Sequence, residues 1–494
     1  MNYQSTRGAI FADEAEAILR GIAADGGLFV DPSIGERPFD WRRALGLSAL
    51  DMQSMLLGHL LPGIPDMDAL VRRAYAGKFE TEDLTPLVRV GQDYVLELFR
   101  GPTAAFKDVA LSMLPQLVAA AKEQRGDRGE TVVLTATSGD TGKAALEGFR
   151  DVPGTRIFVF YPHGGVSPIQ RAQMATQEGR NVTVCAVRGN FDDCQTGVKK
   201  AFATLAGDEA IKARGQELTS ANSINIGRLA PQLVYYFLAY AKLLESGRIR
   251  LGDPVDYVVP TGNFGDILAG WMARQLGLPV GKLVCASNAN RVLTDFFQSG
   301  VYDRRREFYR TDSPSMDILV SSNLERLLFY VSGGDSALVR RCMEQLAKEG
   351  FYRFPDEMMD ALRADFAACC CTDAEGAEEI GRLWRTEGYL CDPHTAVAVH
   401  AARRYKKESG SDAPLVILST ASPYKFPSAV LAALGGAAEG DEFAETDALA
   451  ALTGLPVPPS LALLRGKAER HRDVIGVGEI IPYIQQKLSE DKLT

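Results

Sequence analysis

The sequence predicts an α/β protein with two open lobes and a helical N-terminal domain. From about residue 93, short runs of Val, Ile, Leu and Phe alternate with helical segments, which is typical of parallel strands covered by helices. The alternation resumes near residue 255, so a second α/β lobe follows the first. Before residue 86, apolar residues instead recur at helical spacing.

We expect three parts along the 494 residues. Residues 1–85 form the helical N-terminal domain. Residues 86–434 form the two-lobed core, with the smaller lobe at about 110–215. An insertion is expected at about 295–375, where the chain is charged and aromatic and its β signal is weak. Residues 435–494 begin rich in Ala, Glu and Pro and then form a C-terminal helical extension.

The individual elements follow from local patterns. Helices are expected at 13–24, before the Asp25-Gly26-Gly27 turn, at about 143–150 and at 266–276. Compact apolar runs predict strands at 94–98, 131–135, 156–161, 182–187, 255–259, 282–286 and 415–419.

Composition excludes several classes of protein. The net charge, 54 − 63 = −9, argues against nucleic acid as the main partner. No run of about 20 apolar residues predicts a membrane span, and the N-terminus lacks the pattern of a signal peptide. The eight cysteines and five histidines show no metal-ligand spacing, so we expect no metal. Reduced cysteines indicate a cytoplasmic protein.

Lys107 is the most informative residue. It ends the run Phe99-Arg-Gly-Pro-Thr-Ala-Ala-Phe-Lys107, before a helical stretch rich in Leu, Val and Ala. Apolar neighbours desolvate the amine, which disfavours the ammonium form and lowers its pKa. Such an amine can form a Schiff base with an aldehyde. The alternative is a lysine whose ammonium group extends to solvent.

A glycine-rich loop, Val258-Val-Pro-Thr-Gly-Asn-Phe-Gly-Asp266, joins a strand to a helix. Gly262 and Gly265 bracket the turn and allow backbone amides to face one point, where the helix N-terminus adds positive potential. This geometry binds phosphate, and Asp266 is expected to be the helix N-cap. A plain strand-to-helix turn is the alternative.

A second loop, Thr135-Ala-Thr-Ser-Gly-Asp-Thr-Gly142, also joins a strand to a helix. The hydroxyls of Ser138 and Thr141 suit a carboxylate or phosphate of a substrate. The Gly142-Lys143 pair resembles a nucleotide P-loop, but Thr137 and Ala144 occupy positions where that motif needs Gly and Ser or Thr.

Further candidates lie elsewhere in the core. Thr420 follows a strand, at the end where ligands bind in open α/β sheets. Asn225 and Arg228 are three residues apart at a helix start, and both can reach an anionic substrate. Arg171 is a weaker candidate of the same kind. His394 is expected to be packed or hydrogen-bonded rather than a catalytic base.

Together these motifs closely resemble threonine synthases of the long bacterial and fungal form, which are pyridoxal-phosphate (PLP) enzymes of the tryptophan-synthase-β fold type, fold type II. The resemblance covers nearly the whole chain. It rests on residues 3–8, 24–28, 101–108, 137–142, 222–225, 260–266, 313–318, 392–395 and 420–426. At residues 288–291, Arg291 departs from the acidic residue that many relatives carry.

The resemblance implies two lobes with PLP between them and Lys107 as its covalent anchor. It also implies contacts to PLP from Gly262, Asn263, Phe264, Gly265 and Asp266 at the phosphate, from Thr420 at the pyridine nitrogen, and from Asp140 near the ring. The implied reaction converts O-phospho-L-homoserine and water to L-threonine and phosphate. Expected substrate contacts are Ser138, Thr141, Asn225, Arg228 and Lys425.

Three alternatives stay open. One is another PLP lyase of this fold type, such as a serine/threonine dehydratase or a phospholyase resembling threonine synthase. The second is a catalytically silent ligand sensor, against which the intact Lys107 argues. The third is a nucleotide kinase, which the failed P-loop disfavours. We expect a monomer or homodimer that binds a small-molecule substrate, without nucleic-acid or membrane partners.

Overall fold

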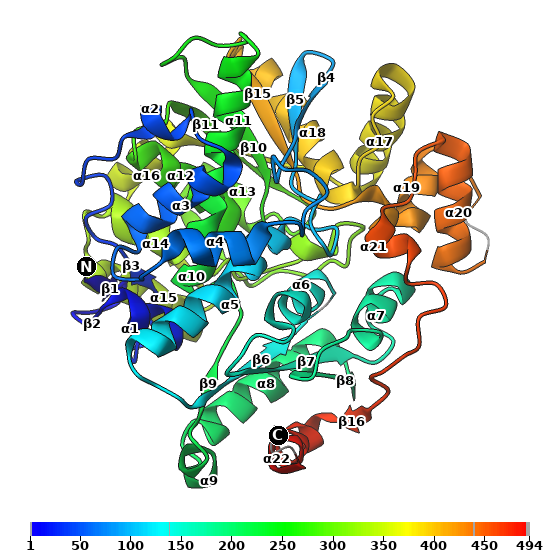
Figure 1. The fold of residues 1–494 in the computed structure, drawn as a ribbon. Coiled ribbons are helices and arrows are strands. Elements are labelled where there is room, and N and C mark those ends of the chain that lie inside the picture. The colour runs from blue at the N-terminus through cyan, green and yellow to red at the C-terminus, as the bar shows by residue number, and fades with distance from the viewer. Residues whose placement is uncertain (1, 138, 438–439, 491–494) are drawn as a thin grey trace.

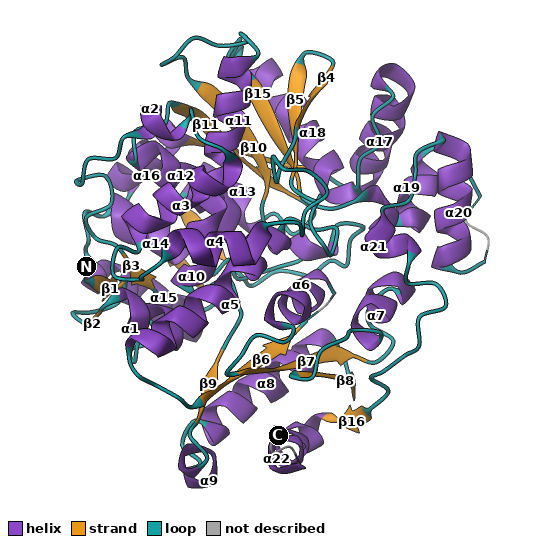
Figure 2. Ribbon diagram, in the orientation of Figure 1, coloured by secondary structure: helices purple, strands orange, loops and turns teal. Residues whose placement is uncertain are grey.

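The computed structural model describes residues 2–137, 139–437 and 440–490 and confirms the α/β fold with two open sheets (Figures 1 and 2). A six-stranded sheet is the centre of the larger lobe and a five-stranded sheet is the centre of the smaller one. All seven predicted strands are present, with small shifts at their ends.

The N-terminal part is helical, with a small antiparallel sheet in the order β2-β1-β3. Helix α1 is shorter than the predicted helix at 13–24, because Asp13 caps its start and Gly21, at φ 69°, ends it. The elements are β1 (Tyr3–Ser5), β2 (Phe11–Ala12), α1 (Glu14–Arg20), β3 (Phe29–Val30), α2 (Trp41–Ala44), α3 (Ala49–Leu60) and α4 (Met67–Tyr75).

The large sheet has the order β14-β11-β10-β15-β5-β4, and only the β4–β5 pair is antiparallel. Its central strands are buried along their length, as parallel strands covered on both faces are. The strands are β4 (Leu87–Val90), β5 (Asp93–Glu97), β10 (Val255–Pro260), β11 (Val280–Ser287), β14 (Phe366–Cys370) and β15 (Leu415–Ser419).

Helices and short turns of the large lobe surround this sheet (Figure 2). They are α10 (Ile226–Leu229), η1 (Ala230–Leu233), α11 (Val234–Glu245), α12 (Gly265–Gln275), α13 (Val292–Ser299), η2 (Pro314–Met316), α14 (Leu324–Val331), α15 (Ser336–Lys348), α16 (Asp356–Asp365), α17 (Asp373–Glu387), α18 (Pro393–Ser409), η3 (Pro423–Lys425) and α19 (Pro427–Ala433).

The segment expected as an insertion at 295–375 is partly a component of this sheet. It contains an antiparallel pair, β12 (Val301–Asp303) and β13 (Phe351–Arg353), which is separate from the main sheet. It also contains β14, which pairs in parallel with β11. The run of β14, Phe-Ala-Ala-Cys-Cys, has weak β propensity, so its place in the sheet depends on tertiary packing.

The small sheet is parallel throughout, in the order β16-β8-β7-β6-β9. Its strands are β6 (Glu130–Ala136), β7 (Thr155–Pro162), β8 (Val182–Arg188), β9 (Gln216–Thr219) and β16 (Val474–Gly476). The helices of this lobe are α5 (Lys107–Gln124), α6 (Asp140–Phe149), α7 (Pro168–Ala175), α8 (Phe191–Leu205) and α9 (Glu209–Ala213). Helix α6 begins at Asp140, earlier than the sequence predicts.

The C-terminal segment runs from the large lobe to the small lobe (Figure 1). Its elements are α20 (Glu442–Thr453), α21 (Pro459–Ala462), β16, η4 (Val477–Glu479) and α22 (Ile480–Glu490). β16 extends the small sheet beside β8, and Ile480, Ile484 and Leu488 of α22 join the core under that sheet. The segment therefore contains a strand in addition to the expected helices. We propose 1–85, 86–434 and 435–494 as the division of the chain.

The eight cysteines are all free thiols, and only Cys370 is not fully buried. Among the helices that the structure describes, none is both long and apolar enough to cross a membrane.

Candidate active site

Lys107 is the first residue of α5 and is only 8% exposed. The loop before it is held at the carboxyl end of β15, because the Phe106 N–H donates to Thr420 O at 2.8 Å. The Lys107 amine therefore lies at the edge where open α/β sheets bind ligands. Its Nζ donates to Ser315 Oγ at 3.2 Å and lies 4.9 Å from the centre of the Phe106 ring.

Charged residues from distant parts of the sequence surround this amine. Burial lowers the pKa of Lys107 to about 8, in the direction that its apolar neighbours predict. The charges of Asp140 and Asp266 raise that pKa, whereas those of Arg228 and Lys425 lower it. The structure thus brings the charges of four other predicted site residues to bear on the Lys107 nitrogen.

The glycine-rich loop after β10 forms an uncapped helix N-terminus. Phe264, at φ 66°, precedes α12, and no side chain caps the helix there. The loop packs closely, because a Cβ on Gly262 would lie 2.8 Å from Ser315 O. The oxygens of Gly262 and Asn263 are fixed by Ser321 Oγ at 2.7 Å and by the Asn323 N–H at 3.0 Å. Because no side chain caps the helix at Phe264, the amides of the loop from Gly262 on and of the helix start, apart from the Ile267 N–H, are available to an anion.

Asp266 is not the N-cap that the sequence predicts. The helix starts one residue earlier, at Gly265, because the left-handed conformation of Phe264 completes the turn. Asp266 is buried in the first turn, where burial raises the pKa of its carboxyl to about 7. Its Oδ1 accepts from the Ile267 N–H at 2.9 Å.

Thr420 directly follows β15 and is 5% exposed. Its backbone oxygen anchors the Lys107 loop, as described above. The preceding Ser419 bonds through its hydroxyl to Thr395 Oγ1 at 2.9 Å. Among the described residues, none forms a hydrogen bond with the Thr420 hydroxyl, which leaves that group for a ligand.

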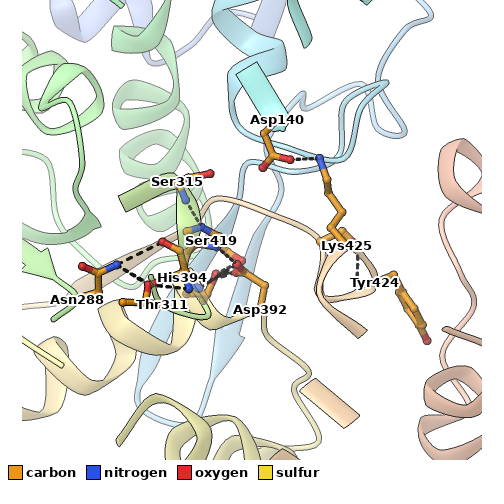
Figure 3. A network of polar contacts seen from close by, with 12 residues as sticks. Asp140, Asn288, Thr311, Ser315, Asp392, His394, Ser419, Tyr424 and Lys425 are labelled. Atoms are coloured by element: carbon orange, nitrogen blue, oxygen red, sulfur yellow. Dashed lines mark hydrogen bonds and ion pairs between the residues drawn. The ribbon is translucent and has the colours of Figure 1, made fainter. Parts of the chain in front are cut away.

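Asp140 and Lys425 form a buried ion pair (Figure 3). Lys425 Nζ lies 2.6 Å from Asp140 Oδ1 and donates to Thr103 O at 3.1 Å. Burial alone would raise the pKa of the Asp140 carboxyl, but Lys425 and Lys107 outweigh it and hold the pKa well below its usual value. Gln170 Nε2 donates to the same carboxylate at 3.1 Å. Lys425, predicted to contact substrate, is thus bound to Asp140 here.

Arg228 is a buried cation without a carboxylate partner among the described residues. Its Nη1 donates to Ala221 O at 2.8 Å, but its Nε is buried and makes no hydrogen bond with the described residues. Burial lowers the pKa of the guanidinium to about 10. A desolvated cation with an unused donor, whose charge reaches Lys107, indicates an anion-binding position.

Asn225, the other residue predicted at this helix start, has a structural task instead. Its Oδ1 caps α10 by accepting from the Gly227 N–H at 2.9 Å, and its Nδ2 donates to Ile18 O at 2.8 Å. Both ends of the amide are therefore occupied within the protein, which explains why Asn225 precedes a helix.

The loop after β6 is shaped by Thr137. Its hydroxyl accepts from the N–H groups of Gly139 and Gly142, at 3.0 and 2.9 Å, and so closes the turn. Thr141 is the second residue of α6, next to Asp140, and is partly exposed. Ser138 lies outside the described residues.

Arg171, the weaker candidate, forms an exposed ion pair with Glu469 at 2.7 Å. Arg291, the departure from the family pattern, pairs with Asp295 at 2.8 Å. Each arginine already has a carboxylate partner, which leaves little reason for either to bind a substrate anion.

The sequence does not predict metal ligands, yet one group in the described part of the chain has the right residue types. Ligand atoms of Cys371, Glu375 and His400 all lie within 4.8 Å of one another. Glu375 also has a structural role, since its Oε2 accepts from the Thr372 N–H at 2.8 Å to complete a capping box on α17. None of the three belongs to the cluster around Lys107.

Ser315 and Asp392 are site residues that sequence reasoning missed. Ser315 lies in η2 and contacts Lys107. It also contacts His394 (Figure 3). Asp392 caps α18 and holds the His394 ring at 2.6 Å. In the sequence, the only signal for these two residues is that they lie within the family-like segments 313–318 and 392–395. His394 is buried and hydrogen-bonded, in keeping with the expectation for it.

Comparison with known proteins places this geometry in a family. Residues 81–421 match the model of the pyridoxal-phosphate dependent enzymes, and residues 395–475 match a threonine synthase C-terminal model. The threonine synthase of Pseudomonas aeruginosa is 40% identical over 442 residues, covering 87% of this chain and 90% of that protein.

Two further comparisons are with a longer protein and with a solved structure that matches over its whole length. Threonine synthase-like 1 of Homo sapiens is 38% identical over 85% of this chain, and the chain spans only 58% of that protein. The crystal structure of PLP-bound threonine synthase from Brucella melitensis is 37% identical, has a TM-score of 0.87, and is covered completely, as is this chain. The chain therefore belongs to the pyridoxal-phosphate dependent enzymes and, within them, to the threonine synthase family.

Proposed function

We propose that this protein is a threonine synthase, which uses PLP to convert O-phospho-L-homoserine and water to L-threonine and phosphate, the last step of threonine biosynthesis. One observation carries the proposal. The buried Lys107 amine, with a pKa of about 8, shares a site with an uncapped helix N-terminus and with the unpaired Arg228. Such a site offers one covalent anchor and two anion positions, which suit a phosphorylated cofactor and a phosphorylated substrate.

The amine, amide and hydroxyl groups of these residues match the groups that PLP would present to them. Lys107 would hold the cofactor covalently, and the amides from Gly262 to Asp266 would hold its phosphate. Position 262 has no room for a side chain, because a Cβ on Gly262 would lie 2.8 Å from Ser315 O. The unused Thr420 hydroxyl would bond to the pyridine nitrogen. Asp140, fixed by Lys425, would face the ring region from the small lobe.

PLP, when bound, supplies an electron sink that stabilises negative charge at the substrate α-carbon. The side chains supply the remaining tasks. Lys107, whose lowered pKa leaves an appreciable neutral fraction, moves protons at the α- and β-carbons. Arg228 binds the phosphate that leaves from the γ-carbon, with Thr141 as a second donor. Water then adds at the β-carbon.

Product identification tests this proposal against its rivals. The purified protein should release phosphate from O-phospho-L-homoserine and form threonine, and Lys107→Ala should do neither. A phospholyase would also release phosphate but would form a 2-oxo acid and ammonia instead of threonine. A dehydratase would act on serine or threonine and leave the phosphorylated substrate intact. A silent ligand sensor would turn over none of these compounds.

The proposal also includes an expected cellular compartment and oligomeric state. We expect a cytoplasmic enzyme, because the eight free thiols suit a reducing compartment. We also expect a monomer or homodimer, a state that analytical ultracentrifugation would report directly.

A further inference from the structure

A chain of hydrogen bonds leads from Lys107 through Ser315 and His394 to Asp392; Figure 3 shows its part from Ser315 to Asp392. Lys107 Nζ donates to Ser315 Oγ at 3.2 Å, and the Ser315 peptide N–H donates to His394 Nε2 at 3.1 Å. His394 Nδ1 lies 2.6 Å from Asp392 Oδ2. The chain joins α5, η2 and α18, which are far apart in the sequence.

The donors fix the protonation state of the imidazole. A peptide N–H can only donate, so His394 Nε2 must present its lone pair to Ser315. The ring proton then lies on Nδ1 and is donated to Asp392. Because Nε2 is occupied by the backbone of Ser315, His394 does not face a reacting carbon and acts only through Ser315.

Asp392 is held rigidly for this task. It is 0% exposed, and its Oδ2 also accepts from the His394 N–H at 3.0 Å. Its Oδ1 accepts from the N–H of Thr395 at 3.1 Å and from the hydroxyl of that residue. Since Thr395 also bonds to Ser419 at 2.9 Å, the network ends beside Thr420.

The segment before Ser315 is also held by contacts that do not involve His394. Asn288 Nδ2 donates to Ser313 Oγ at 3.0 Å and to Thr311 Oγ1 at 2.8 Å, which holds the segment before Ser315 (Figure 3). Loss of His394 should therefore release the Ser315 peptide without unfolding the loop.

We propose that His394 is a positioning residue that, in the Nδ1–H form held by Asp392, orients Ser315 and through it the free Lys107 amine. The inference rests on the proposed function, in which Lys107 must carry protons to defined carbon atoms. A hydroxyl at 3.2 Å restricts the otherwise free rotation of the lysine head group, and restricting a proton carrier raises the rate of transfer rather than substrate affinity.

The tautomer can be read directly by long-range proton–nitrogen NMR of the holoenzyme labelled with 15N-histidine. With five histidines in the chain, the His394 signals are assigned by their loss in His394→Gln. We expect a protonated Nδ1 and an unprotonated Nε2. In Asp392→Asn, an amide group facing Nδ1 should move the proton to Nε2. A wild-type ring protonated on Nε2, or on both nitrogens, would overturn the proposal.

Kinetics provide the second measurement. His394→Ala and Asp392→Asn should each lower kcat for phosphohomoserine by about 10- to 100-fold with little change in KM. His394→Gln, whose amide oxygen can accept from Ser315 in place of Nε2, should recover most of that loss. His400→Ala, on the same helix, is the matched control and should retain the wild-type kcat. An unchanged kcat in His394→Ala, or a His394→Gln variant as slow as it, would refute the positioning role.

The two measurements keep the proposals separate. The NMR result does not require turnover, so a wild type that makes no threonine refutes the proposed function and leaves the tautomer assignment intact. An active wild type with the proton on Nε2 refutes only the role of His394. If Asp392→Asn fails to fold, the comparison of His394→Ala with His394→Gln decides alone.

Discussion

Replacing Arg228 with methionine should separate the cost of burying its guanidinium from its value in binding phosphate. Burial lowers the pKa of Arg228 to about 10, and at about 1.36 kcal/mol per pKa unit below its ordinary value the buried charge costs ~3 kcal/mol. Its hydrogen bond to Ala221 O returns about 1.5–3 kcal/mol, as bonds to charged groups do. Methionine removes both terms, so the free energy of unfolding of the ligand-free protein should stay level or rise.

Substrate binding should respond in the opposite direction. Two charge-assisted hydrogen bonds from the guanidinium to a phosphate are worth at least ~3 kcal/mol together, which corresponds to a rise in KM for phosphohomoserine of about 100-fold. Inorganic phosphate should also raise the Tm of the PLP-loaded wild type, in which the cofactor would fill the other anion position, and fail to do so in PLP-loaded Arg228→Met. The measurements are urea unfolding without ligand, steady-state kinetics, and thermal unfolding with phosphate.

Arg326→Met is the matched control. Arg326 is equally buried and its pKa is also lowered to about 10, but its donors reach Phe29 O at 3.0 Å, Ile224 O at 2.6 Å and Asn323 Oδ1. Removing it leaves those acceptors unpaired, so the control should be clearly destabilised. If Arg228→Met is destabilised as much as Arg326→Met and its KM is unchanged, Arg228 is structural and the reasoning fails.

Three further outcomes are expected. Lys107→Ala should abolish turnover yet retain weakened PLP binding through the phosphate loop; full loss of PLP retention on gel filtration would contradict this. Asp140→Asn should lower the free energy of unfolding by about 3–5 kcal/mol, because it leaves Lys425 buried without its counter-charge. An acid with a lowered folded pKa stabilises above its unfolded pKa, and that stability is lost as pH falls, so the deficit of Asp140→Asn, measured by urea unfolding, should shrink in acid. Burial raises the pKa of Asp266 to about 7, so stability of the apo protein should fall as pH rises from about 4 through 7, and Asp266→Asn should lack that slope.

The fold was largely predictable because most strands carry their own signal. The runs at 131–135 and 156–161 are apolar and β-branched or aromatic, and they become β6 and β7. β14 carries no such signal, since Ala and Cys do not favour strands, and β16 is only three residues long; each gains its place from the strand beside it. Local propensity is a weak guide wherever neighbouring strands determine the conformation.

The candidate site was predictable where the backbone makes a close turn. Gly262 and Gly265 are visible in the sequence because a close turn restricts the residue type. The N-cap at Asp266 was wrong, since the positive φ of Phe264 is not encoded by any common turn residue. The contact of Ser315 with His394 joins positions 79 residues apart, which only the packing of η2 against α18 brings together. The capping role of Asn225 was not predicted, although Asn before a helix is an ordinary capping signal.

The buried groups of the site carry more positive than negative charge when no ligand is bound. Lys107, Arg228 and Lys425 are buried cations. Of the two carboxylates whose charges raise the pKa of Lys107, Asp140 is held ionised by its surroundings, whereas burial raises the pKa of Asp266 to about 7. Without ligands the described residues of this cluster therefore carry excess positive charge in a desolvated space, which is unfavourable for the protein alone. Two phosphate groups, one on the cofactor and one on the substrate, would balance it. Ligand binding would then stabilise the folded protein, because a ligand that binds the folded state and not the unfolded state raises the free energy of unfolding.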